Sequence, residues 1–395
     1  MIRTLWHEVA GLRGHVGWRE LIGLPPWEGY RLTAKRLLNL YRVRYQYVTG
    51  STAVSGMPVK LTIEPTSACN LRCPGCFTGI DEVGRTRGAM SLELYRSLLA
   101  ELGDYLFELE FYNWGEPLLA KQLPIMIREA HERGISTTVS TNFSLPFDAE
   151  KAERLVTSGL TVLGVSVDGA RQESYEQYRV RGDLALVLEN CRLVTEAKRR
   201  LGSRTPRLVW EFHVFEHNHQ DVELARELAR DLEMDICVSK GWNIGAEWNP
   251  GGEWQFFGKP RPVRCPFLWG FAVVNNDGGV SPCCGTFYSE DDMGRVSAEV
   301  ERSGATTFRD VWNGERFQAA RGFYRRRDGS PQARAHVCHD CPNTVLHEQW
   351  REHRAAGGDA RSFEVGFTMN DVVNYFWNRR PGRRQPAGEA RRAAP

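Results

Sequence analysis

The order of apolar and polar positions along the chain changes at about residue 58. After this point, short apolar stretches typical of strands alternate with longer stretches in which apolar residues recur every three or four positions, as in amphipathic helices. We expect strands over residues 59–66, 106–115, 135–142, 160–169, 206–218 and 234–240, and helices over residues 91–103, 119–134, 149–159, 183–202 and 219–233. This alternation predicts parallel strands joined by right-handed crossovers. Six units are too few for an eight-stranded barrel, so residues 58–242 are expected to form an open, partial (β/α)6 TIM-type barrel of the α/β class.

Residues 1–57 have helical periodicity instead, and they carry eight Lys or Arg against three Asp or Glu. Leu37, Leu38, Tyr41 and Tyr45 share one face of a predicted helix, with Arg and Lys on the other face. Two interpretations remain open. The helix packs on the barrel, or it is a basic amphipathic helix that makes a peripheral contact with a membrane or a partner.

Composition divides the rest of the chain. Residues 243–262 are rich in Gly, Pro and Trp and are expected to form a linker or a loop over a pocket. A second group of cysteines marks residues 263–350 as a further small domain, followed by an extension over 351–375. Residues 376–395 carry six Arg and one Glu and are expected to be a disordered basic tail.

The overall composition narrows the classes of function. The chain has 395 residues and a net charge of +2, which gives no reason to expect a nucleic-acid partner. We find no stretch with the pattern of a signal peptide or a transmembrane helix. Ten cysteines without a secretion signal favour metal sites in a reducing cytoplasm over disulfides.

Three of these cysteines, Cys69, Cys73 and Cys76, have the spacing C-x3-C-x2-C and follow the first predicted strand. Reactive groups gather at the carboxyl ends of the strands in barrels of this type. Four thiolates complete a tetrahedral zinc site or a [4Fe–4S] cluster, so three leave one coordination position open. A zinc knuckle with a remote fourth ligand is the structural alternative.

This spacing on this loop resembles the signature of the radical S-adenosylmethionine (SAM) superfamily. The family often has an aromatic residue before the third cysteine, whereas this chain has Gly75 there and Phe77 after the cysteine. The resemblance implies that the three cysteines hold a [4Fe–4S] cluster whose fourth iron binds SAM through its amino and carboxylate groups. It implies that an external donor of the flavodoxin or ferredoxin type reduces the cluster. Cleavage of SAM then gives a 5′-deoxyadenosyl radical that abstracts hydrogen from a substrate.

Motifs at the ends of later strands agree with this resemblance. The stretch "YNWGEP" looks like the family's Gly-Gly-Glu-Pro motif, with Trp114 in place of the first Gly. The resemblance implies that Glu116 accepts hydrogen bonds from the SAM ammonium group and that Gly115 and Pro117 shape the turn. It also implies SAM contacts at the following positions: Asn142, Ser166, Asp168, Arg179 or Arg181, and Asn218. A Gly-Glu-Pro turn and surface arginines are also common in proteins that do not bind SAM. The spacing of His213, His217 and His219 fits a strand end and the following loop better than a metal site.

The second cysteine group has the pattern C-x12-G-x4-C from Cys265 through Gly278 to Cys283, followed by Cys338 and Cys341 as C-x2-C. This pattern is similar to the SPASM/Twitch extension of radical SAM barrels. The similarity implies one auxiliary [4Fe–4S] cluster with four cysteine ligands, because no cysteine follows Cys341. Cys284 is the alternative to Cys283, and a structural zinc ribbon is the alternative to the cluster. The auxiliary cluster is expected to carry electrons or to be structural.

The sequence thus predicts a radical SAM oxidoreductase or maturase-type enzyme with an unidentified substrate. Peptides or proteins, amino sugars or other small molecules, and lipid or cell-envelope intermediates are all open. Residues 1–57 lack the strand pattern of an integral peptide-binding domain, which counts against one form of the first option. A non-catalytic iron–sulfur or zinc protein, acting in electron transfer or structure, is the hypothesis from another class.

Overall fold

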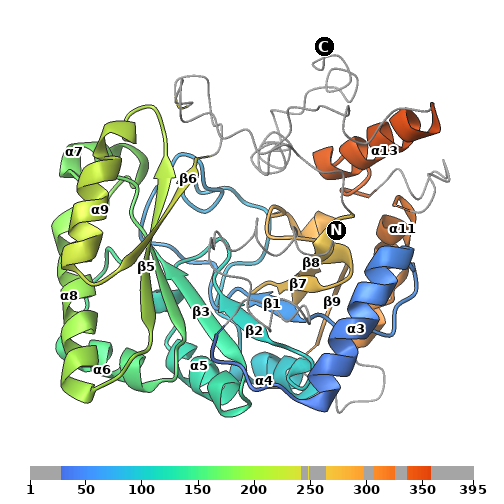
Figure 1. Ribbon diagram of the computed structural model, residues 1–395, viewed down its shortest axis with the longest axis horizontal. Coiled ribbons are helices and arrows are strands. Elements are labelled where there is room, and N and C mark those ends of the chain that lie inside the picture. Colours follow the sequence, from blue (N-terminus) through green and yellow to red (C-terminus); the bar gives the residue numbers. More distant parts are fainter. Residues whose placement is uncertain (1–27, 242–247, 249–263, 298–305, 325–335, 357–395) are drawn as a thin grey trace.

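The computed structural model describes residues 28–241, 248, 264–297, 306–324 and 336–356. Six parallel strands are adjacent in chain order: β1 (Lys60–Ile63), β2 (Glu108–Phe111), β3 (Ser136–Thr141), β4 (Val162–Ser166), β5 (Arg207–Val214) and β6 (Asp235–Lys240). The helices between them are α4 (Leu92–Leu102), α5 (Leu123–Glu132), α6 (Ala149–Thr157), α7 (Gln172–Tyr178), α8 (Leu184–Leu201) and α9 (Val222–Asp231). They cover the outer face of the curved sheet (Figure 1). The predicted α/β partial barrel is confirmed, and α7 is a helix that the periodicity did not predict.

Short-range chemistry explains where these helices begin and end. Ser91, Asp148 and Asp183 cap α4, α6 and α8 by accepting a hydrogen bond from a backbone N–H in the first turn. Gly202 ends α8 in the left-handed conformation, with φ of 62°. The caps set the ends, and burial of one apolar face against the sheet supplies most of the stabilisation.

The strands have two different faces. Leu61, Ile63, Leu109 and Phe111 are buried in the main core with the helices. Because successive side chains of a strand point to opposite faces, the polar residues of β1 and β2 lie on the inner face of the barrel. Charged residues in the middle of a parallel sheet are unusual, since such strands are normally apolar on both faces. The barrel therefore has a polar interior.

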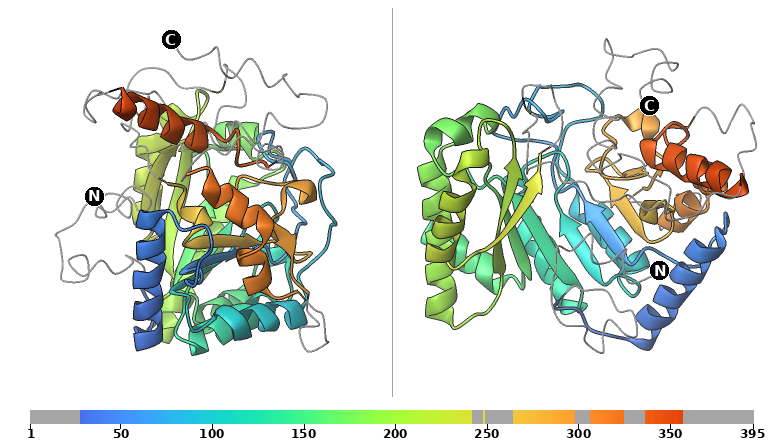
Figure 2. Two further views of the ribbon diagram at one scale, coloured as in Figure 1. Left: turned by 90° about the vertical axis from the view of Figure 1, so that its right-hand side faces the viewer. Right: turned by 45° about the horizontal axis from the view of Figure 1, so that its top comes forward.

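The second cysteine segment extends the barrel sheet, which the sequence did not predict. Strand β7 (Phe271–Val274) pairs in parallel with β1, and β8 (Gly279–Ser281) and β9 (Gly294–Arg295) continue the sheet in antiparallel order. Figure 2 shows these orange strands beside β1. Helices α10 (Phe308–Trp312), α11 (Glu315–Gly322) and α13 (Pro342–Ala355) follow, and α13 continues across the boundary predicted at residue 350. We call residues 264–297, 306–324 and 336–356 the C-terminal lobe.

Helix α3 (Ala34–Thr49) lies against the outside of the barrel. Its buried residues are Arg36, Asn39, Leu40 and Val43. The predicted face was wrong as a packing face, because its members Leu38, Tyr41 and Tyr45 are exposed. The helix does pack on the body of the protein, but it turns a partly polar side inward.

Some predictions concern residues outside the described ranges. The proposed linker over 243–262, apart from Trp248, and the tail over 376–395 are among them. In the described part of the chain, none of the helices combines the length and apolarity that crossing a bilayer requires.

Candidate functional site

The loop after β1 brings Cys69, Cys73 and Cys76 together. Each thiol is close enough to the other two for them to interact electrostatically. Burial raises the pKa of each of the three thiols to about 11. The loop folds tightly over itself at Gly79, where a Cβ atom would lie 2.3 Å from the carbonyl oxygen of Cys73.

The surroundings of the three thiols suit an iron–sulfur cluster. Leu71, Tyr178 and Phe215 form an apolar lining around them. The backbone N–H of Leu71 and the side-chain amide of Asn142 donate to Cys69 Sγ, at 3.5 and 3.7 Å. Donors of this kind favour the thiolate form that ligation requires.

The three thiols are not arranged as the ligands of a single metal ion. Among the described residues, no three His, Cys, Asp or Glu side chains converge as ligands of one ion. A [4Fe–4S] cluster makes a different demand, since each thiolate binds a different iron. The donor set of three thiols therefore fits a cluster with one iron left open.

Glu116 connects the Gly-Glu-Pro turn to the cysteine loop. Its backbone N–H donates to the carbonyl of Ala68 at 2.8 Å. Its buried carboxylate accepts hydrogen bonds from the N–H of Leu118, the hydroxyl of Thr141 and the N–H of Asn142 at 3.0, 2.6 and 2.8 Å. Because Asn142 also donates to Cys69, a continuous chain of hydrogen bonds joins Glu116 to a predicted cluster ligand.

Gly115 and Pro117 have local structural reasons to be present. A Cβ atom on Gly115 would lie 1.8 Å from the carbonyl oxygen of Thr66, so this glycine permits close contact with the chain leading into the cysteine loop. Pro117 begins the 3-10 turn Pro117–Leu119, which the Glu116 side chain caps. These contacts hold the turn beside the three cysteines.

Asp168 and Arg179 form a buried ion pair, with Asp168 Oδ2 at 2.6 Å from Arg179 Nη2. The other carboxylate oxygen of Asp168 accepts from the backbone N–H of His213 at 2.7 Å. Burial alone would raise the pKa of Asp168, but Arg179 and His213 lower it to about 2. Arg179 also lies beside Cys73. The guanidinium thus has an internal counterion, and any contact with a SAM carboxylate would be additional to it.

The remaining predicted residues lie at the ends of β4 and β5. The amide of Asn218 donates to the carbonyls of Asp168 and His213, at 3.0 and 2.9 Å, and its oxygen accepts from the N–H of Phe215. The hydroxyl of Ser166 donates to Glu211 at 3.0 Å. Arg181, by contrast, is exposed and has a positive φ of 72°.

The inner face of the barrel carries a set of charged residues that the sequence did not predict. Lys60 Nζ lies 2.5 Å from Glu110 and 3.7 Å from Glu108. The hydroxyls of Thr62 and Thr138 donate to these two carboxylates. Burial raises the pKa of Glu108 to about 7.

Glu211 continues this inner face on the far side of β4. Its Oε2 accepts from the hydroxyls of Ser140 and Ser166, at 2.6 and 3.0 Å. Gly164 makes room for it, because a Cβ atom there would lie 2.5 Å from Glu211 Oε1. The signal was available, since polar residues alternate with apolar ones in β1 and β2, but it points to a polar interior only once these strands are known to be central.

The C-terminal lobe gathers the second cysteine group. The thiol of Cys283 interacts electrostatically with those of Cys265, Cys338 and Cys341. Burial raises the pKa of Cys265 to about 12 and that of Cys341 to about 11. The Cys284 thiol also interacts electrostatically with those of Cys283 and Cys265, and it lies near Glu110 and Lys60 as well.

The lobe and the cysteine loop meet in an aromatic cluster. Phe77, directly after Cys76, stacks on Phe287 with ring centroids 4.8 Å apart. Trp114 packs edge-on against Phe77 at 4.8 Å, and its indole N–H donates to the carbonyl of Thr286 at 2.9 Å. The tryptophan of the "YNWGEP" stretch thus ties the Glu116 turn to the lobe.

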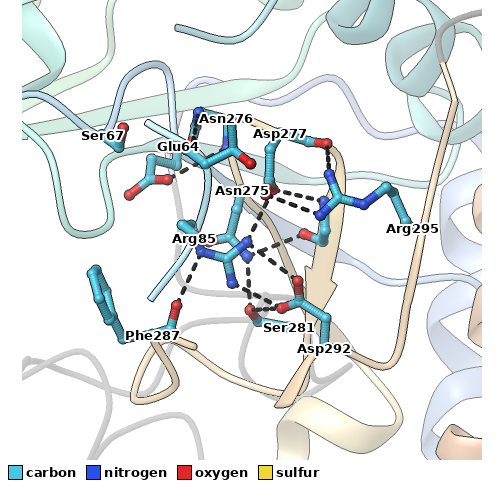
Figure 3. A network of polar contacts seen from close by, with 12 residues as sticks. Glu64, Ser67, Arg85, Asn275, Asn276, Asp277, Ser281, Phe287, Asp292 and Arg295 are labelled. Atoms are coloured by element: carbon cyan, nitrogen blue, oxygen red, sulfur yellow. Dashed lines mark hydrogen bonds and ion pairs between the residues drawn. The ribbon is translucent and has the colours of Figure 1, made fainter. Parts of the chain in front are cut away.

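A network of polar contacts lies next to this cluster (Figure 3). Arg85 forms ion pairs with Asp277 and Asp292, each at 2.9 Å, and all three side chains are buried. The carboxylate of Glu64, at the end of β1, accepts from the N–H groups of Trp114 and Asn276. Burial raises the pKa of Glu64 to about 7.

Comparison with known proteins identifies the family. The model of the radical SAM superfamily matches residues 63–206, and that of the SPASM iron–sulfur cluster-binding domain matches residues 265–342. The chain belongs to the radical SAM superfamily. Membership implies a [4Fe–4S] cluster and SAM for the barrel, and auxiliary iron–sulfur binding for the SPASM region.

Relatives of this radical SAM protein differ in what they make. The chain is 33% identical over 129 residues to Fe-coproporphyrin III synthase from Methanosarcina barkeri, covering 32% of each chain. It is 29% identical over 123 residues to PqqA peptide cyclase from Rhodopseudomonas palustris, covering 31% of this chain and 32% of the relative. The chain thus spans about a third of the length of these curated relatives.

The fold has a solved counterpart. Streptococcus suis SuiB bound to S-adenosylmethionine aligns with a TM-score of 0.54 and 12% identity, covering 77% of this chain and 76% of SuiB. At this identity the likeness concerns the fold alone.

Proposed function

We propose that this protein is a radical SAM oxidoreductase or maturase-type enzyme whose SAM-binding cluster is held by Cys69, Cys73 and Cys76. The observation that carries the proposal is the convergence of these three thiols beside the chain of hydrogen bonds from Glu116 through Asn142. When bound and reduced by an external electron donor, the cluster and SAM supply a 5′-deoxyadenosyl radical for hydrogen abstraction.

The residues around the thiols would position SAM and exclude water. Glu116 is proposed to accept from the SAM ammonium group, since its Oε2 accepts one hydrogen bond within the described structure and can accept another. The ionised pair of Asp168 and Arg179 fixes the charge next to Cys73. Tyr178 and Phe215 shield the thiols on the side of α7 and β5.

The inner face is proposed to bind the substrate. Glu108, Glu110 and Glu211 outnumber Lys60 there, and hydroxyl groups accompany each carboxylate. Such a surface favours a substrate that offers hydrogen-bond donors, either hydroxyl or amine groups. Peptides and sugars both meet this description, so both classes from the sequence stay open, while a purely apolar lipid chain fits it less well.

Cys265, Cys283, Cys338 and Cys341 are proposed to hold the auxiliary cluster. Their mutual proximity supports this set. Cys283, Cys338 and Cys341 all pack against Val337, which supports Cys283 over Cys284 as the ligand. Full ligation by four thiolates leaves no open iron, which suits electron transfer or a structural role.

Anaerobic reconstitution tests the proposal. We expect about eight irons per chain, as two [4Fe–4S] clusters require, and release of 5′-deoxyadenosine after addition of dithionite and SAM.

The Cys73→Ala variant should abolish that release and retain about four irons in the auxiliary site. Cys237→Ala, a change at an exposed cysteine outside both groups, is the matched control and should behave as the wild type. Bound zinc without SAM cleavage in the wild type would overturn the proposed function, and undiminished cleavage by Cys73→Ala would overturn the cysteine assignment.

A further inference from the structure

Helix α3 presents an apolar stripe to the outside of the molecule. Leu38, Tyr41, Tyr45 and Val48 expose 52%, 48%, 69% and 55% of their surface. Their spacing of three and four residues places them on one line along the helix. Figure 1 shows α3 at the outer edge of the protein, where the lobe and the barrel meet.

The other side of α3 is held by polar contacts. The Arg36 guanidinium donates to the carbonyls of Gly103, Arg133 and Gly134, at the carboxyl ends of α4 and α5. Such ends carry the negative pole of the helix dipole, which a buried cation complements. Asn39 exchanges two hydrogen bonds with the backbone of Met57, at 2.8 and 2.9 Å. Leu40 and Val43 on this inner side pack with Phe107 and Phe271. The helix therefore has an apolar side toward the core, and the exposed stripe is a second apolar side that the core does not use.

The charges of α3 are of one sign. Residues 34–49 contain no Asp or Glu. At 100° per residue, the exposed Arg42 lies along one side of the stripe, and Arg31, just before the helix, is also exposed. Arg44 lies along the other side, but its Nε and Nη2 atoms are buried, so it does not belong to the exposed cations. Lys35 is excluded from this set because it pairs with Asp104 at 2.6 Å.

We propose that the outer face of α3 docks on the surface of an anionic lipid bilayer. Leucine, valine and the rings of tyrosine enter the boundary between headgroups and acyl chains, while phenolic hydroxyls stay in the interface. The exposed guanidinium groups of Arg31 and Arg42 pair with lipid phosphates, which accept hydrogen bonds in the geometry that guanidinium favours. An anionic bilayer matches three features of α3: the apolar stripe, the cations beside it and the absence of acidic residues.

A second copy of the chain fits the same face less well. In a symmetric dimer, the patch of one copy meets the identical patch of the other. The arginines of α3 would then face arginines, and α3 offers no carboxylate to neutralise them. The charge pattern therefore favours a phosphate-bearing partner over self-association.

The amino end of α3 and the cysteine loop lie at opposite edges of the sheet. Arg36 fastens α3 to the ends of α4 and α5, and these helices return from the carboxyl edge of the sheet to its amino edge. The three cysteines lie at the carboxyl edge, after β1. The contact thus anchors the enzyme and keeps its predicted catalytic face open to a substrate from the aqueous side.

Vesicle sedimentation with the full-length, reconstituted protein tests this proposal. The probes are phosphatidylcholine vesicles with and without phosphatidylglycerol, at low and high salt. We expect binding only to the anionic vesicles, with weakening at high salt. The double variant Leu38→Ser/Tyr45→Ser should lower the partition coefficient at least tenfold, because insertion of one leucine side chain is worth about that factor.

Matched controls separate the stripe from general surface effects. Ile125→Ser/Leu201→Ser removes two other exposed apolar side chains and should leave binding unchanged. Arg42→Glu should weaken binding about tenfold or more, since it changes two charge units near the lipid, whereas Arg128→Glu on the exposed surface of α5 should not.

Absence of vesicle binding by the wild type, or equal binding by the stripe variant, would overturn the proposal. A wild-type dimer that the stripe variant makes monomeric, without vesicle binding, would overturn it in favour of self-association. None of these outcomes depends on SAM cleavage.

Discussion

Glu116 has a structural role in the site and a proposed role in binding SAM. Its carboxylate holds the backbone of Asn142 and the hydroxyl of Thr141, and through Asn142 it reaches Cys69. The same carboxylate is the proposed acceptor for the SAM ammonium group. Replacement of Glu116 therefore alters both the local hydrogen bonds and the proposed ligand contact, and a useful experiment must separate the two.

We expect Glu116→Gln to lower SAM affinity by about 1.5–3 kcal/mol, the usual worth of a hydrogen bond to a charged group. Thr141→Val is the control, because it removes the two hydrogen bonds of the Thr141 hydroxyl, one to Glu116 and one from the N–H of Phe143, and leaves the carboxylate in place. Its effect on SAM affinity should be below about 1 kcal/mol. Anaerobic titration of the reconstituted variants with SAM measures both values. Equal affinities in the wild type and Glu116→Gln would remove Glu116 from the SAM site.

At the scale of elements, local patterns predicted the barrel well. Strands β1 to β6 and five of the helices appear where apolar periodicity placed them, because both kinds of element bury a face that the sequence reveals directly. The three cysteines after β1 and the Glu116 turn after β2 were therefore expected at one edge of the sheet. Their proximity in the structure follows from parallel strand order alone.

Elements whose environment depends on distant contacts were not predictable in this way. The inward side of α3 is set by Arg36 binding carbonyls that lie about a hundred residues along the chain, at Arg133 and Gly134, which no local pattern reveals. Strand β7 joins β1 across more than two hundred residues. Lys60 and Glu110 are recognisable as an inner-face pair only once β1 and β2 are known to be neighbours.

At Trp114 the chain differs from the family's motif, and the structure gives a reason for the difference. The indole replaces a glycine of the motif and packs edge-on against both Phe77 and Phe287, which stack on each other. We expect Trp114→Gly to destabilise the contact between barrel and lobe by about 3 kcal/mol, through lost packing. Trp114→Phe keeps a ring and loses only the hydrogen bond to Thr286, so it should cost about 1 kcal/mol.

Hydrogen exchange of residues 264–297 in the reconstituted protein measures this effect, since local opening reports the stability of the lobe contact. Protection should fall strongly in Trp114→Gly and slightly in Trp114→Phe. Equal protection in the wild type and Trp114→Gly would mean that the aromatic cluster does not hold the lobe.

For the molecule as a whole, the central question is what holds the two predicted cluster sites in a fixed relation. The shared sheet through β1 and β7 is one connection. The aromatic cluster of Phe77, Trp114 and Phe287 is a second. The network of Figure 3 is a third, because Arg85 belongs to the segment after the cysteine loop while Asp277 and Asp292 belong to the lobe. Both partners of each ion pair are buried, so the loss of one partner leaves an uncompensated charge inside the protein.

We therefore expect Arg85→Met to destabilise the protein by about 3–5 kcal/mol, the range found when one member of a buried ion pair is removed. Arg87→Met is a close control two residues away, because Arg87 and its partner Asp81 are exposed by more than half, and its loss should cost at most about 1 kcal/mol. Adding Asp292→Asn to Arg85→Met should recover part of the loss, since it neutralises the carboxylate left without a cation, whereas Asp277 keeps its ion pair with Arg295. Denaturant unfolding of the reconstituted variants under anaerobic conditions measures all three. If Arg85→Met and Arg87→Met were equally stable, the polar network would not be what joins the lobe to the cysteine loop. The shared sheet and the aromatic cluster would then have to fix the distance between the two cysteine groups.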